Sequence, residues 1–131
     1  MEKEVKMNIA LWILQGILAV AFLMAGGFKL LTPAEEMLAM GMTVPTLALR
    51  IAGITELLGA LGLILPSALR IKPQLTSIAA SLLAIQVGLA VVYHLVMGEV
   101  DAIVPPLFLL LLCGIVAYGR FNKFPILARV Q

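Results

Sequence analysis

The side chains of this sequence that could take part in chemistry are few, and each interrupts an apolar run. The candidates for ligand contact or proton handling are Lys29, Arg50, Glu56, Gln86, Tyr93 and His94. Charged and polar groups in apolar surroundings are costly unless they pair, become neutral or face water. They indicate either a polar-lined cleft that contacts a quinone-like ligand or relays protons, or polar contacts that only hold helices together.

Glu56 gives the sharpest of these signals. It lies about ten residues into its apolar segment, which puts it about 15 Å deep, near the midplane of a bilayer. Ala52, Gly59 and Ala60 share its helical face, and small residues let neighbouring helices approach closely. We expect its carboxyl group to be neutral or ion-paired, and the candidate partners are Lys29, Arg50 and His94.

Several other kinds of site are excluded by the residues present. His94 is the only histidine, and one histidine with one glutamate gives too few protein ligands for a zinc site. His94 and Met97 lie on one helix and are poorly placed to ligate haem. Cys113 is the only cysteine and cannot close a disulfide within the chain. No metal is expected and no cofactor is assigned with certainty, which leaves quinone as the candidate.

The elements that must position these residues are apolar helices. Of 131 residues, 63% are hydrophobic and 12% charged, against about 45–50% and 25% in soluble domains. The net charge is only +2 and the charged residues are scattered along the chain, which excludes a nucleic-acid binder. Four apolar segments, near 8–31, 47–65, 75–97 and 102–118, are each long enough to cross a bilayer as a helix. The sequence predicts an all-α polytopic membrane four-helix bundle, with residues 1–131 forming a single domain.

Two alternatives for these segments are disfavoured. A β-barrel would show alternation of polar and apolar residues, and the segments are continuous apolar runs. A cleaved signal peptide would have an apolar core of about 7–15 residues, and the first segment is longer. The first segment is therefore expected to remain as a membrane helix.

Helical phase predicts which side of the first segment is buried. At 100° per residue, its strongly polar residues Asn8, Gln15 and Lys29 fall on one face. Polar groups facing lipid are costly, so this face should point into the bundle. Lys29 is then expected to point inward near one end of the helix.

The basic residues predict the orientation. Seven of the nine lie at one side of the four segments, which under the positive-inside bias puts both termini in the cytoplasm. These seven are Lys3, Lys6, Arg70, Lys72, Arg120, Lys123 and Arg129. Lys29 and Arg50 lie on the opposite side and break this trend, so each either has a partner in the protein or extends to the outer headgroups.

The first outer loop predicts a short helix. Thr32, Pro33 and Glu35 have the spacing of a capping box with proline at the first helical position. Met37, Leu38 and Met40 would give that helix an apolar face, and Gly41 would end it. The helix could cover the mouth of the bundle as a lid or serve only as an interfacial anchor.

Three stretches of the sequence resemble the DoxX-like family of small four-helix membrane proteins. They are AGGFKL at residues 25–30, GITELLGALGL at residues 53–63, and Tyr93-His94. The resemblance implies a multi-pass protein of the bacterial cytoplasmic membrane. Relatives include the small membrane subunits of thiosulfate:quinone oxidoreductase.

The resemblance and the residues together support two functional hypotheses. In the first, the chain is an accessory membrane subunit of a quinone-linked oxidoreductase, with its partner subunit carrying the catalysis and a cleft beside Glu56 and His94 taking the ligand. In the second, it is a non-enzymatic binding or assembly protein for a lipid, a small hydrophobic molecule, a protein partner or a second copy of itself.

Overall fold

The structure, a computed structural model, describes residues 1–129 and contains five α-helices. They are α1 (Glu2–Leu31), α2 (Ala34–Ala39), α3 (Thr46–Leu69), α4 (Gln74–Val96) and α5 (Val104–Tyr118). A 3₁₀ turn (Val100–Ala102) precedes α5 and a π-helix (Gly119–Lys123) follows it. Helices α1, α3 and α4 and the run Val100–Lys123 are each long and apolar enough to cross a membrane. The chain is therefore an all-α integral membrane protein, as predicted.

The helix bounds differ from the prediction at several ends. Helix α1 begins six residues earlier, at Glu2 rather than residue 8, and its first turn carries an exposed ion pair between Lys6 and Glu2, at 3.3 Å. Helix α3 continues through Pro66 to Leu69 instead of ending before the proline. Proline removes one backbone donor, and membrane helices tolerate this where neighbouring groups satisfy the freed carbonyl.

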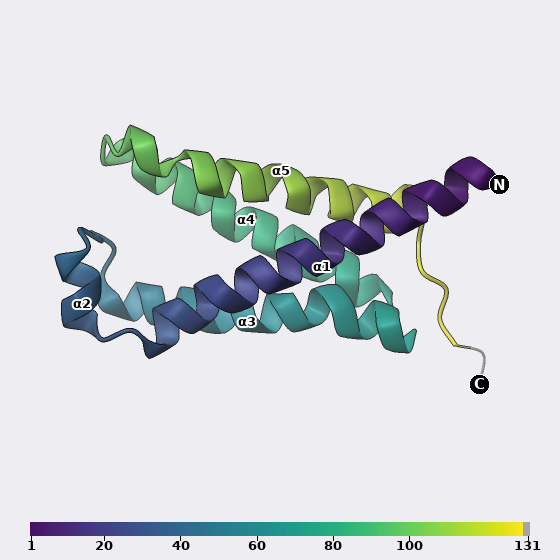
Figure 1. Ribbon diagram of the computed structural model, residues 1–131, viewed down its shortest axis with the longest axis horizontal. Helices are drawn as coiled ribbons and strands as arrows, with labels where there is room; N and C mark the ends of the chain where they lie inside the picture. Colours follow the sequence, from purple (N-terminus) through teal and green to yellow (C-terminus); the bar gives the residue numbers. More distant parts are fainter. Residues whose placement is uncertain (130–131) are drawn as a thin grey trace.

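The four long helices pack in the order α1, α3, α4, α5, with each of the first three contacting the next. The start of α1 and the last described residues lie at one end of the bundle and α2 lies at the other (Figure 1); we call these the terminal end and the α2 end. Helices α1 and α5 meet near the terminal end, where a Cβ on Gly119 would come within 2.9 Å of Leu11. The two helices diverge toward the α2 end (Figure 1).

Burial follows the pattern of a membrane protein. Large apolar side chains such as Ile17, Leu58 and Leu111 are exposed on the outside, where lipid would contact them. The core combines apolar residues such as Leu18, Phe22 and Leu63 with polar ones. The buried polar residues are Gln15, Glu56, Ser67, Thr76, Ser77 and Arg120. Polar groups are placed inside because lipid offers them no hydrogen bonds.

Helices α1 and α3 touch backbone to backbone. A Cβ added to Gly26 would come within 2.8 Å of the Gly53 carbonyl oxygen, and a Cβ on Gly53 within 2.9 Å of the Gly26 carbonyl oxygen. Distances this short leave no room for a methyl group, so glycine is required at both positions. Lys29 and Glu56 each lie three residues beyond one of these glycines, so the contact brings their side chains together.

Helix α2 forms, but the capping-box prediction is wrong. Helix α2 begins at Ala34 without a side-chain cap, and Thr32 instead ends α1, its N–H donating to the Phe28 carbonyl. The Thr32 backbone is extended, with φ −77° and ψ 130°, and its carbonyl accepts a hydrogen bond from Arg50. Because Thr32 is held as the end of α1, its hydroxyl does not cap α2.

The three apolar residues predicted for this helix differ in their burial. Met37 is buried, whereas Leu38 and Met40 are exposed. Gly41 follows the helix with φ +87°, a backbone conformation that favours glycine, as the sequence indicated.

Candidate functional site

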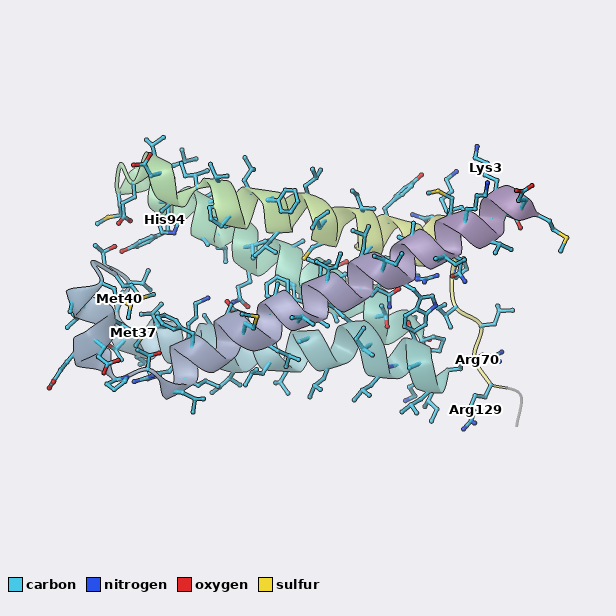
Figure 2. All side chains as sticks on the ribbon, viewed as in Figure 1. Lys3, Met37, Met40, Arg70, His94 and Arg129 are labelled. Carbon is cyan, nitrogen blue, oxygen red and sulfur yellow. The ribbon has the colours of Figure 1, made fainter. Side chains whose placement is uncertain are left out.

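A cavity of about 690 Å³ lies at the α2 end, between α1, α3, α4 and α5. Its walls are mostly apolar, and the segment 40–44 after α2 lines one side of it. Five of the six candidate residues predicted from the sequence line this cavity: Lys29, Glu56, Gln86, Tyr93 and His94. Figure 2 shows His94 on α4 and Met40 beside α2 at this end of the bundle, with Lys3, Arg70 and Arg129 at the opposite end.

The polar floor of the cavity is centred on Glu56. Its Oε1 accepts a hydrogen bond from Lys29 Nζ at 2.5 Å and another from Gln86 Nε2 at 3.0 Å. The Glu56 side chain is 4% exposed and that of Lys29 23%. The carboxylate therefore joins α1, α3 and α4 at one point, and of its three expected partners it pairs with Lys29.

The second carboxylate oxygen of Glu56 has no partner. Among residues 1–129, Glu56 Oε2 is the one buried side-chain polar atom without a hydrogen bond. An ionised carboxylate can accept about four hydrogen bonds, so half of this group is unused. A buried polar atom without a partner is unfavourable, and a hydrogen-bond donor that reached Oε2 would relieve that cost.

Gln86 is held in place by groups of α3. Its Nε2 donates to the Ala52 carbonyl at 3.3 Å as well as to Glu56, while its Oε1 accepts from the Thr55 hydroxyl at 2.5 Å. Thr55 was not among the candidates predicted from the sequence. Thr55 immediately precedes Glu56, so its side chain lies about 100° round α3 from that of Glu56, toward α4. This helical phase was the sequence signal that could have identified Thr55.

A second cluster of polar side chains lies at the mouth of the cavity. Tyr93 Oη and Thr43 Oγ1 lie 2.8 Å apart, and Thr43 Oγ1 also lies 3.4 Å from Glu99 Oε1. His94 Nδ1 lies 3.2 Å from the same Glu99 oxygen. His94 therefore pairs with Glu99 and not with Glu56. These contacts join the segment after α2 to the end of α4 and to the loop that follows it.

Arg50 is not among the residues that line the cavity. Its Nη1 donates to the carbonyl oxygens of Lys29 at 2.7 Å and Thr32 at 2.8 Å. These carbonyls belong to the last turn of α1, where helix carbonyls lack intrahelical partners and a cation is favourable. Both basic residues that break the orientation trend thus have partners within the protein.

A separate polar cluster at the terminal end surrounds Arg120. The buried guanidinium donates to Gln15 Oε1 at 2.7 Å and Asn8 Oδ1 at 2.6 Å, and to the Phe124 carbonyl at 2.8 Å. It also lies 5.6 Å from the centre of the Trp12 ring. In the sequence, Arg120 was used only as one of the basic residues that predict the orientation. Asn8 and Gln15 lie seven residues apart on one helical face, which indicated that this face has a polar partner.

The chemistry of the cavity is that of an ion pair in an apolar space. Lys29 offers hydrogen-bond donors and Glu56 an acceptor, side by side, at the base of apolar walls. Within residues 1–129, no group of three or more His, Cys, Asp or Glu residues is placed to hold a metal ion. The arrangement is suited to a molecule with a small polar head and an apolar body.

The sequence profile of the DoxX-like family matches residues 13–116, a range that contains all six candidate residues. No curated protein and no solved structure matches the chain significantly.

Proposed function

This chain belongs to the DoxX-like family, and on that premise we propose that it is an accessory membrane subunit of a quinone-linked oxidoreductase. Its cavity at the α2 end binds the head of a quinone-class ligand, and a partner subunit carries the electron transfer. The observation that supports this proposal most directly is the unpartnered oxygen of Glu56 in the floor of an apolar cavity.

Each residue of the floor has a role in this proposal. Lys29 Nζ and Glu56 Oε1 are 2.5 Å apart, and together they hold the polar head of the ligand. Gln86 orients the carboxylate through its hydrogen bond to Oε1. When a quinol is oxidised, its two electrons pass to the partner subunit, one of its two protons passes to the Glu56 carboxylate and the other leaves to water at the cavity mouth.

The mouth and the surroundings complete the proposal. Tyr93 and His94, with Thr43 and Glu99, border the route by which a ligand head reaches the floor. We place the bundle, as one domain, in the bacterial inner membrane with both termini in the cytoplasm. The gathering of Lys3, Arg70 and Arg129 at the terminal end supports this orientation (Figure 2).

A second candidate function is favoured by the hydrogen bonds between helices. Arg50 joins α3 to the end of α1, and Gln86 joins α4 to α3, so these side chains also stabilise the bundle. A non-enzymatic protein that binds a lipid or assembles a protein complex, including a homo-oligomer, would use the same contacts without redox chemistry.

The test is gentle purification of the full chain from its native membrane, followed by mass spectrometry of the bound proteins and lipids. A copurifying quinone together with an oxidoreductase subunit supports the first function. A bound phospholipid without either one supports the second and contradicts the first.

Two substitutions at Glu56 and one control sharpen this test. Glu56→Gln keeps the shape of the side chain and removes its charge, so a role as ion pair or proton acceptor predicts that the chain still inserts but retains less quinol. If Glu56 only holds the helices by hydrogen bonds, Gln is silent and Glu56→Ala is harmful. Glu35→Gln makes the same chemical change at an exposed position of α2, outside the cavity lining, and should leave quinol retention unchanged.

A further inference from the structure

We infer that the cavity selects a ligand whose polar head donates a hydrogen bond, so that of a quinone and quinol pair it takes the quinol. The inference rests on the proposed function, in which the cavity holds a quinone-class ligand. It adds a preference between the two redox forms of that ligand, and this preference follows from the way in which the hydrogen bonds of the floor are used.

The floor has an unused acceptor beside a donor that is only partly used. Both protein donors, Lys29 Nζ and Gln86 Nε2, bond to the same oxygen of Glu56, and its Oε2 receives none. A carboxylate paired with an ammonium group is an acceptor only. The ligand must therefore bring the donor that Oε2 lacks.

Lys29 adds a second requirement. Its ammonium group has three N–H donors, of which the bond to Glu56 uses one, and the residue lines the same cavity. A hydroxyl group can accept from Lys29 and donate to Glu56 at once. A quinone carbonyl can only accept, and it would leave Oε2 without a partner.

The other residues of the cavity narrow the choice further. Tyr93 and His94 at the mouth already bond to Thr43 and Glu99, whereas the buried polar atom without a partner, among the described residues, belongs to the floor. An anionic head, such as a phosphate or carboxylate, would put like charge against Glu56. Glu56 lines the cavity while its Oε2 is buried, so the ligand head reaches Oε2 by displacing the end of this side chain, whose last torsion is soft.

The experiment measures binding of decylubiquinol and decylubiquinone, under anaerobic conditions, to the full chain in phosphatidylcholine nanodiscs. A hydrogen bond to a charged group predicts that the quinol binds about ten to a hundred times more tightly than the quinone. Glu56→Gln offers an amide that both donates and accepts, so it should remove this preference. The matched variant Glu35→Gln should keep it.

A second pair of probes makes the result independent of any variant that fails to fold. Wild-type chain should bind 4-hexylphenol about tenfold or more tightly than its methyl ether, 4-hexylanisole, because only the phenol can donate to Glu56.

Equal affinity for the two members of each pair would overturn the inference and leave the proposed ligand class standing. Tighter binding of the quinone would also overturn it, because Glu56 would then be the donor. Absence of binding by all four probes would overturn both the inference and the proposed function.

Discussion

The contact between Gly26 and Gly53 predicts a stability difference between two neighbouring alanine substitutions in α1. A Cβ at Gly26 would stand 2.8 Å from the Gly53 carbonyl oxygen, whereas a Cβ at Gly27 meets nothing within 4 Å. Ordinary van der Waals contact begins at 3.4 Å, so Gly26→Ala forces α1 and α3 apart by about 0.6 Å. Crowding of this kind typically costs about 1–3 kcal/mol.

The comparison of Gly26→Ala with Gly27→Ala isolates that cost. Both substitutions gain the same helix propensity, up to about 1 kcal/mol, so the gain cancels between them. We expect Gly26→Ala to be less stable than Gly27→Ala by about 1–3 kcal/mol. The measurement is equilibrium unfolding of the full chain in mixed micelles, followed by the fluorescence of Trp12, the only tryptophan. Equal stability of the two variants would refute the close approach of α1 and α3 and its role in bringing Lys29 to Glu56.

Four further predictions concern other parts of the bundle. Arg120→Lys replaces a planar group that bonds to two side chains of α1, so the free energy of unfolding should fall by about 1–3 kcal/mol; unchanged stability in the same micelle assay would contradict the buried cluster. Thr43→Val removes the hydroxyl that contacts Tyr93, and hydrogen exchange at residues 40–44 should rise while that of the middle of α3 stays the same; no rise would show that this contact does not hold the segment. Thr32→Ala should leave the exchange of α2 unchanged, because no side-chain cap is present; faster exchange would restore the capping box. Reporter fusions to either terminus should be active in the cytoplasm, and activity on the other side of the membrane at both ends would reverse the orientation.

The burial of Glu56 and its pairing with Lys29 were within reach of the sequence because both depend on local quantities. Helix length sets the depth of Glu56, and helical phase puts Lys29 on the same buried face as Gln15. A costly charge near the midplane then requires an opposite charge, and few were available. The four apolar helices followed from composition and run length in the same way.

The role of Arg50 was beyond such reasoning because it depends on the exact end of another helix. Its partners are backbone carbonyls of α1, and every helix has such groups, so the sequence does not mark them. The Arg120 cluster required knowing that α5 continues into a π-helix, which brings a residue 105 positions away to Gln15. The polar contacts of Thr43 depend likewise on how a loop folds back.

The glycine contacts of α3 are staggered along its length, and this has a mechanical consequence. Gly53 meets α1 toward the α2 end, whereas Cβ atoms at Gly59 and Gly62 would lie 2.6 and 2.7 Å from side chains of α4, toward the terminal end. The close contact between α3 and α4 is therefore remote from the cavity mouth. Closer to the α2 end, hydrogen bonds of Gln86 join α4 to α3 at the cavity floor, and the contact of Tyr93 with Thr43 joins α4 to the segment after α2 at the mouth. We expect α4 and α5 to tilt outward as a pair, so that the cavity widens for a bulkier ligand. The ion pair of Lys29 and Glu56, which lies on α1 and α3, would then keep its geometry.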